Sequence, residues 1–299
     1  MEKIFLVANP RSGMLKLKNN LLNIINVFSQ AGYLVTVYPT KGRRDATNVI
    51  SRLSDEYTTI ICCGGDGTLN EVIAGLMQNE NRYRLGYIPA GTLNEWSSSL
   101  GISRNMITAA QDIVNGCILP LDIGMFDQNY FTYTASFGAF TDASYSTPQD
   151  IKNIIGQAAY ILEGIKSIGN IKPCKMTFKY DDKVIDGEFL FGSISNSMSV
   201  GGIIKLDQSI AALNDGLFEV LLIKNPANIS QLNSIINCII KKDFNNPNIY
   251  FFRTNHLSIN ADRDIPWTLD GELAFPRKNE FEINNIQSAV SFYIPNSAS

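Results

Sequence analysis

The chain has 299 residues, of which 45% are hydrophobic and 18% are charged. This length accommodates two ordinary domains, and this composition excludes a disordered or fibrous protein. The formal net charge of −3 argues against sequence-independent nucleic-acid binding, which draws its affinity from many basic contacts to phosphate. We therefore expect no nucleic-acid partner.

The sequence carries no export or membrane-spanning signal. The early apolar run at residues 4–8 is too short for a signal peptide and meets Asn9-Pro10 at once. No stretch reaches the roughly 18 apolar residues of a spanning helix, so any membrane contact should be peripheral. The five cysteines contain no C-x-x-C pair, which disfavours a zinc site. We expect a cytoplasmic protein.

The first part of the chain alternates short β-rich runs with helical apolar spacing. Strands are predicted at residues 3–8, 33–38, 58–62 and 85–88. Helices are predicted before Gly32 and over residues 45–53 and 68–77. Such alternation is typical of a parallel sheet flanked by helices, so residues 1–123 are predicted to form an α/β domain.

The pattern changes near residues 120–125 to many short strands separated by turn residues. Strands are expected at 175–180, 184–194, 217–223 and 257–259, with helices at 147–168 and 229–240. We therefore expect residues 124–299 to form an antiparallel β domain. An aromatic cluster in this part, Tyr130, Phe131, Tyr133, Phe137 and Phe140, is predicted to pack in the core, with a lipid slot as the alternative.

A glycine-rich turn, Gly64-Gly65-Asp66-Gly67-Thr68, follows an apolar strand and opens a helix. Glycine permits a positive φ and a close approach to a ligand, and the helix N-terminus attracts an anion. The turn is not a P-loop, and Asn70 stands where a dinucleotide fingerprint needs its last glycine. Phosphate binding is the favoured interpretation, with a plain strand-to-helix turn as the alternative.

Asp66 would repel a phosphate unless a cation lay between them, which points to magnesium. Two further loops, residues 9–13 and 89–95, follow predicted strands. The ends of parallel strands lie on one edge of a sheet, where α/β domains bind ligands. Each loop alone could equally be a turn followed by a helix cap.

Five motifs in a fixed order resemble the diacylglycerol kinase catalytic family, which also includes sphingosine kinases and bacterial lipid kinases. They are Asn9-Pro-Arg-Ser-Gly13, Gly64-Gly-Asp-Gly-Thr-Leu-Asn-Glu71, Gly91-Thr-Leu-Asn94, Asn214-Asp-Gly216 and Asp270-Gly-Glu272. The glycine turn alone is shared with NAD kinases and phosphofructokinases. The resemblance implies an N-terminal NAD kinase/diacylglycerol kinase-like nucleotide-binding domain, a C-terminal antiparallel β-sandwich, and an active site in the cleft between them.

The resemblance also implies an ATP- and Mg²⁺-dependent kinase that phosphorylates a lipid hydroxyl, most simply of a diacylglycerol-like acceptor at the inner face of the membrane. Glu272 matches the proton acceptor, and Asp66 would hold the magnesium of the nucleotide. Asp215 matches a structural magnesium site, completed by the carbonyls of Ala212 and Leu217, although Asp-Gly is by itself a turn signal. The residues expected around ATP are Asn9, Pro10, Arg11, Ser12, Gly13, Thr40, Gly65, Asp66, Gly67, Thr68, Leu69, Asn70, Glu71 and Thr92.

The chain departs from the family pattern after Asn94, where Glu95, Trp96 and Ser98 replace Asp, Phe and Arg. Nucleotide affinity or substrate choice could therefore differ. A second Asp-Gly-Glu, at 186–188, is interpreted as a decoy in a turn between two strands.

Two other functions stay open: an NAD-kinase-like enzyme with a soluble acceptor, and a non-catalytic nucleotide- or lipid-sensing module. A Ser-His hydrolase is disfavoured, because His256 is the sole histidine and no G-x-S-x-G occurs. The acceptor lipid and the oligomeric state, including a homodimer, are also left open.

Overall fold

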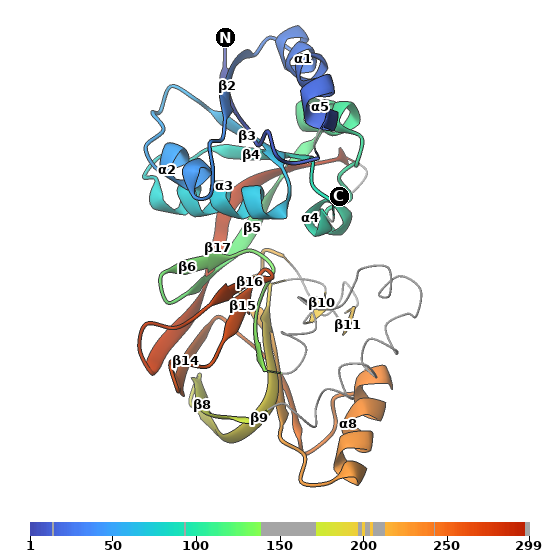
Figure 1. The fold of residues 1–299 in the computed structure, drawn as a ribbon, viewed down its shortest axis with the longest axis vertical. Helices are drawn as coiled ribbons and strands as arrows, with labels where there is room; N and C mark the ends of the chain where they lie inside the picture. The colour runs from blue at the N-terminus through green and yellow to red at the C-terminus, as the bar shows by residue number, and fades with distance from the viewer. Residues whose placement is uncertain are drawn as a thin grey trace. The chain divides into compact units, whose positions relative to one another are not determined.

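The computed structural model describes residues 1–13, 15–92, 94–138, 172–196, 199–200, 204–205, 213–241 and 243–296. The chain forms two compact units, Met1–Leu121 with Ser288–Ser299, and Asp122–Gln287 (Figure 1). The sequence had assigned the whole C-terminal part to the second domain. Ser288–Ser299 belong instead to the first unit, because the end of β17 (Glu280–Ile294) pairs with its sheet.

The first unit has a parallel sheet in the order β2-β1-β3-β4, with β17 added beside β4. Its strands are β1 (Lys3–Ala8), β2 (Leu34–Pro39), β3 (Thr59–Gly64) and β4 (Arg84–Pro89). Every residue of β3 is buried, as expected for a central parallel strand covered on both faces. The predicted α/β architecture is confirmed.

Helices form two packed groups in this unit: α1 contacts α5, and α2 contacts α3. The helices are α1 (Leu15–Gln30), α2 (Asp45–Ile50), α3 (Asp66–Gln78), α4 (Glu95–Ser99) and α5 (Met106–Asn115). After α1 the chain turns at Gly32, whose φ of 88° suits a glycine beyond a helix end. Asn105 caps α5 by accepting hydrogen bonds from the amides of Ile107 and Thr108.

The second unit is built mainly of antiparallel pairs. Its elements are β5 (Cys117–Phe126), β6 (Asn129–Phe131), β7 (Thr134–Gly138), β8 (Cys174–Tyr180), β9 (Lys183–Ser195), β10 (Ser199–Val200), β11 (Ile204–Lys205), β12 (Phe218–Lys224), α8 (Ile229–Lys241), β13 (Ile249–Thr254), β14 (His256–Ala261), β15 (Trp267–Leu269) and β16 (Glu272–Ala274). The long strand β9 pairs with β8 along its first half and with β7 and β12 along its second half. It therefore joins the β8-β14-β17 strands to the β16-β15-β7 strands.

An aromatic core fills the second unit. The Phe137 ring lies 6.0 Å from Phe178 and 4.8 Å from Trp267, measured between centroids. Phe131 and Phe137 are buried, which confirms core packing for these two members of the predicted cluster. Phe140 and the predicted helix at 147–168 lie outside the described residues. No helix in the described part of the chain is long and apolar enough to cross a bilayer.

Candidate active site

Three loops of the first unit meet at the carboxyl edge of its sheet. The Asn9 Nδ2 group donates to Thr68 Oγ1 at 2.8 Å, which ties the loop after β1 to α3. Ser12 Oγ accepts a hydrogen bond from the Gly65 amide at 3.3 Å. The Ala90 amide donates to the Gly64 carbonyl at 2.7 Å, which adds the loop after β4. The structure thus brings these predicted loops together.

The glycines of the turn allow neighbouring parts of the chain to come close together. None of Gly64, Gly65 and Gly67 has a positive φ. The expected positive φ in this turn was therefore wrong. A Cβ on Gly64 would lie 2.6 Å from Thr68 Cβ, and a Cβ on Gly91 would lie 2.7 Å from Gly65 Cα. Side chains at these positions would push the loops apart, because such contacts are far inside van der Waals distance.

Helix α3 begins at Asp66, two residues before the predicted start. The amides of Thr68 and Leu69 both donate to the Gly65 carbonyl, so the helix starts directly in the turn. The amides of a first helical turn, reinforced by the helix dipole, favour an anion at this end. We call this turn, Gly64 to Thr68, the cradle; an anion is the kind of ligand that such a helix end favours.

The Asp66 carboxylate lies in this first turn, beside the hydroxyl of Tyr87. Tyr87 Oη lies 3.5 Å from Asp66 Oδ1 and 3.2 Å from Asn94 Oδ1. Burial, followed by the charge of Asp66, raises the pKa of Tyr87. Tyr87 stays protonated at neutral pH and can donate to either oxygen. The Tyr87 hydroxyl is therefore a hydrogen-bond donor that the Asp66 and Asn94 side chains share.

Glu71 has an anchoring role that its place in the motif did not indicate. Its Oε1 accepts from the Arg44 amide at 2.7 Å, and its carbonyl accepts from Thr47 Oγ1 at 2.8 Å. The Thr40 amide donates to the Ala8 carbonyl at 2.8 Å. These bonds fix the loop after β2 beside the cradle.

The other residues expected around ATP differ in exposure. Leu69 is fully buried, so its side chain supports the core of the first unit and is not presented at the surface. Those that are exposed are Pro10, Arg11, Gly67 and Thr92, and those that are partly exposed are Asn9, Ser12, Gly13, Thr40, Gly65, Asp66, Asn70 and Glu71.

An exposed basic run was missed in the sequence. Lys41, Arg43 and Arg44 follow β2 directly and are exposed. Their signal is three cations within four residues after a strand that ends at the ligand-binding edge. They add positive charge beside the loop that carries Thr40.

Two of the departures after Asn94 have a structural explanation. Trp96 is buried, and its ring stacks on Phe292 of β17 at 6.0 Å. Tryptophan at this position therefore packs α4 against the returning strand. Ser98 is exposed and accepts a hydrogen bond from Arg104 Nη2 at 3.4 Å, so a cation does lie next to this position.

In the second unit, Glu272 opens β16 directly after a two-residue hairpin turn. The turn residues Asp270 and Gly271 have φ of 50° and 84°. Positive φ at both central positions defines the tight turn that favours Asp-Gly between strands. Leu269 and Glu272 are the paired residues that close it. The side chain of Glu272 is exposed.

The Asp270 carboxylate locks this hairpin. It accepts four hydrogen bonds, from the amides of Thr132, Tyr133 and Thr134 and from Thr132 Oγ1, at 2.7 to 2.9 Å. Burial raises the pKa of Asp270, and these bonds oppose that rise. Asp270 thus ties the turn before Glu272 to residues 132–134, a structural contact that its place in the motif did not reveal.

The second Asp-Gly-Glu lies inside β9, so its assignment to a turn was wrong. The hairpin turn falls at residues 181–182, between β8 and β9. Asp186 stands opposite Thr177, whose Oγ1 donates to Asp186 Oδ1 at 2.6 Å, and Glu188 stands opposite Lys175. The strand ranges expected from the apolar spacing, 175–180 and 184–194, had already left residues 181–183 for this turn.

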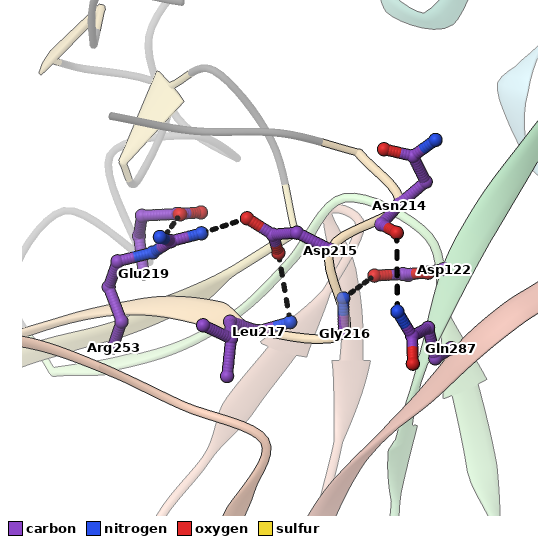
Figure 2. A network of polar contacts seen from close by, with 8 residues as sticks. All are labelled: Asp122, Asn214, Asp215, Gly216, Leu217, Glu219, Arg253 and Gln287. Atoms are coloured by element: carbon purple, nitrogen blue, oxygen red, sulfur yellow. Dashed lines mark hydrogen bonds and ion pairs between the residues drawn. The ribbon is translucent and has the colours of Figure 1, made fainter. Parts of the chain in front are cut away.

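The loop before β12 holds Asp215 in a polar network (Figure 2). Asp215 Oδ1 accepts from the Leu217 amide at 3.0 Å, and Asp215 Oδ2 faces the Arg253 guanidinium. The Gly216 amide donates to Asp122 Oδ2 at 2.6 Å. The sequence left a plain Asp215-Gly216 turn as the alternative to a metal site, and this turn is present in the structure. Ala212 lies outside the described residues.

Arg253 also pairs with Glu219, whose Oε1 accepts from Arg253 Nε at 3.1 Å. Glu219 is fully buried, and its other oxygen has no hydrogen-bond partner among the described residues. Burial raises the pKa of Glu219 to about 7, and Arg253 opposes that rise. Neither Arg253, which pairs with Asp215, nor Glu219, which pairs with Arg253, was foreseen, because neither residue matches a motif.

The network fits a magnesium ion only in part. A carboxylate has about four lone-pair sites, and the two described contacts of Asp215 leave room for a metal. Arg253 already offsets its charge, however, and the described residues contain no group of three His, Cys, Asp or Glu arranged for a metal. No catalytic step is therefore assigned to this position.

Two family models match the two parts of the chain. The diacylglycerol kinase catalytic domain matches residues 3–126, and the YegS C-terminal NAD kinase beta sandwich-like domain matches residues 136–284. These matches confirm the expected α/β domain and the expected β-sandwich.

Relatives cover nearly the whole chain. A diacylglycerol kinase of Bacillus subtilis is 33% identical, over 94% of this chain and 93% of its own. A diacylglycerol kinase of Staphylococcus saprophyticus is 31% identical, over 97% of this chain and 95% of its own. A crystal structure of a diacylglycerol kinase from Bacillus anthracis has the same fold, with a TM-score of 0.75 at 22% identity, covering 100% of this chain and 98% of that one. The chain belongs to the diacylglycerol kinase catalytic family.

Proposed function

We propose that the protein is a lipid kinase that transfers the γ-phosphoryl group of ATP to a lipid hydroxyl, with a diacylglycerol-like acceptor. The proposal rests mainly on one observation: three loops meet at the N-terminus of α3. Hydrogen bonds that involve Asn9, Thr68 and Gly65 connect them. Membership of the family and the printed function of its relatives support the choice of a lipid acceptor. Work on a membrane lipid from the cytoplasm requires a transient, peripheral contact with the inner face.

The phosphates of ATP are assigned to the cradle of the first unit. The amides of the first turn of α3 would offset negative charge, and residues 9–13, Thr40, 65–71 and Thr92 would surround the nucleotide. Glu71 would act by holding the Arg44 loop in place. The loops need little rearrangement during phosphoryl transfer, because hydrogen bonds already hold them together.

A cation is needed because Asp66 shares its helix turn with the anion site. Its carboxylate would repel a phosphate directly, and carboxylate oxygen is a ligand that magnesium prefers. Asp66 fits the role of holding the metal of the nucleotide. When bound, magnesium would neutralise charge that develops on the phosphoryl oxygens.

Glu272 is the proposed general base. Its carboxylate would accept the proton of the lipid hydroxyl while the hydroxyl oxygen forms a bond to the γ-phosphorus and ADP leaves. The rigid turn that Asp270 locks would hold Glu272 in a constant orientation. Such positioning matters because small displacements of a catalytic group lower rates steeply.

The experiment that tests the proposal is incubation with labelled ATP, Mg²⁺ and a panel of lipid and soluble acceptors. We expect label in a lipid product. Label in NAD or another soluble acceptor without lipid would support the NAD-kinase-like alternative. ATP that binds but stays intact in the presence of every lipid would support the sensing module.

Gly91→Ala should open the cradle and lower kcat/KM for ATP by up to ~10²-fold, because a Cβ there meets Gly65 Cα at 2.7 Å. Gly42→Ala is the matched control, since a Cβ at Gly42 meets nothing within 4 Å. Steady-state kinetics with varied ATP checks both. Equal kinetics for the two variants would contradict the proposed role of close packing in the cradle.

Asp215→Ala should lower the melting temperature in a chelator, because the ion pair with Arg253 and the Leu217 hydrogen bond are lost. In Mg²⁺ the drop should be larger, since a metal bound only by the folded state adds stability by mass action. Thermal unfolding in the two buffers measures both parts. Equal falls in melting temperature in the two buffers would mean that Asp215 binds no metal and serves only its contacts within the protein. Ala212 and Leu217 would then not be metal ligands.

A further inference from the structure

Glu219 and Arg253 form a charge pair across two neighbouring strands. They stand directly opposite each other in the antiparallel pairing of β12 with β13. The Glu219 side chain is fully buried, and its Oε1 accepts from Arg253 Nε at 3.1 Å. A buried carboxylate that loses its counter-charge is strongly destabilising. The strand register and the charge of Glu219 therefore fix the Arg253 guanidinium at this place.

Asp215 contacts the other end of the same guanidinium. Its Oδ2 faces Arg253 Nη2, and its Oδ1 accepts from the Leu217 amide at 3.0 Å (Figure 2). The side chains of Asp215 and Arg253 are 28% and 34% exposed, so water reaches this contact, whereas the Glu219 side chain is fully buried. Charge pairs that water reaches contribute little free energy. Arg253 can therefore leave Asp215 at low cost, but it cannot leave Glu219.

The backbone on either side of Asp215 is held by bonds that do not involve the guanidinium. The Asn214 carbonyl accepts from Gln287 Nε2 at 3.5 Å, and the Gly216 amide donates to Asp122 Oδ2 at 2.6 Å (Figure 2). Both bonds join the turn to distant parts of the chain within the second unit. The Asp215 carboxylate can therefore change its partner while the turn that carries it keeps its place.

We propose that the Arg253 guanidinium competes with magnesium for Asp215. The inference rests on the assignment of a metal to Asp215 within the proposed function. A metal on this carboxylate would lie close to the guanidinium, and two cations that share one carboxylate repel each other. Arg253 therefore gives up Asp215 when the metal binds and keeps its bond to Glu219. The competition raises the Mg²⁺ concentration at which the site fills, and below that concentration the guanidinium offsets the charge of Asp215.

Calorimetric titration with MgCl₂, without ATP or lipid, measures the competition. Glu219→Gln/Arg253→Gln removes the guanidinium together with the buried carboxylate that needs it. Glu219→Gln alone is the matched control, because it keeps the guanidinium beside Asp215. The double variant should bind Mg²⁺ ~3- to 10-fold more tightly than the control, because no partly exposed ion pair has to break and no cation repels the metal. Equal affinities would overturn the proposal.

Two more variants complete the titration. Asp215→Ala should lose the magnesium binding that wild type shows; unchanged binding would place the metal elsewhere and overturn the inference together with the metal assignment. If the double variant does not fold, Arg253→Lys decides. Its ammonium group can pair with Glu219 but lacks the planar fork that contacts two carboxylates at once, so its Mg²⁺ affinity should rise by a smaller factor. Wild-type affinity in Arg253→Lys would then contradict the competition.

Thermal unfolding gives a second measurement of the same exchange. Compared with Glu219→Gln, the double variant should melt at a lower temperature in a chelator, because Asp215 has lost its counter-charge, and this difference should shrink in excess Mg²⁺. Asp215→Ala has the opposite expectation, a larger drop in Mg²⁺. A difference of equal size in both buffers would make the contact of Arg253 with Asp215 purely structural and overturn the proposal.

The fate of the proposed function is measured separately, by transfer of label from ATP to lipid in the wild-type protein. If the titrations show the competition and no lipid is labelled, the lipid kinase function fails and the competition at Asp215 stands. If lipid is labelled and the double variant binds Mg²⁺ like Glu219→Gln, the function stands and the competition is wrong.

Discussion

Asp66→Asn is expected to lower phosphoryl transfer by ~10³-fold or more, because electrostatic stabilisation of the transferred group is usually the largest catalytic contribution. The variant keeps the size of the side chain and removes the charge that would hold the metal of the nucleotide. The protein should remain folded, since Asp66 lies at the start of α3 and is only partly buried. Turnover measured over a range of Mg²⁺ concentrations checks the rate, and thermal unfolding checks the fold.

Asp112→Asn is a matched control for Asp66. Asp112 is a partly buried aspartate on α5 of the same unit and takes no part in the described contacts among the three loops. It should turn over like wild type. Near wild-type turnover of Asp66→Asn would remove this carboxylate from the mechanism, whereas equal losses in both variants would indicate a general effect of charge on the first unit.

Glu272→Gln is expected to lower kcat by ~10²- to 10⁴-fold, the range of general base catalysis. Glutamine keeps the shape of the side chain and loses the ability to accept a proton. The affinity for ATP should change little, because the phosphate cradle is built from the first unit. Turnover with saturating lipid and a separate ATP-binding isotherm distinguish the two effects.

Glu188→Gln is the internal control, because it alters the same tripeptide in a different setting. Glu188 lies within β9 opposite Lys175, and its carbonyl accepts from the Asn225 amide at 2.9 Å. It should have almost wild-type activity. Loss of turnover in Glu188→Gln with an active Glu272→Gln would mean that the wrong Asp-Gly-Glu was chosen. Activity in both variants would place the base elsewhere.

The predicted elements that proved reliable were those with local signals. The turn at Gly64 to Thr68 joins a buried strand to a helix, and both neighbours carry the expected apolar periodicity. Parallel strands place their carboxyl ends together, so the convergence of the three loops followed from the α/β pattern. The turn at Asp270-Gly271 is also a local feature, because Asp-Gly suits the two successive positive φ values of a tight hairpin.

The features that the sequence did not show depend on contacts between distant residues. Strand β17 contributes to both units, and a run of alternating residues does not tell which sheet each half will join. Asp270 accepts its hydrogen bonds from residues more than 130 positions earlier in the chain. Arg253 reaches Asp215 from a neighbouring strand, and no spacing rule links the two. Tertiary pairing determines such contacts.

The most direct test of the proposed lipid kinase activity follows the label from the γ-phosphoryl group of ATP into a lipid extract, with ADP measured in the same samples. With vesicles that contain diacylglycerol and with Mg²⁺ present, the proposal predicts labelled lipid and ADP in equal amounts, both strongly reduced by Glu272→Gln. ADP released as inorganic phosphate forms, with no label in the lipid, would contradict the proposal.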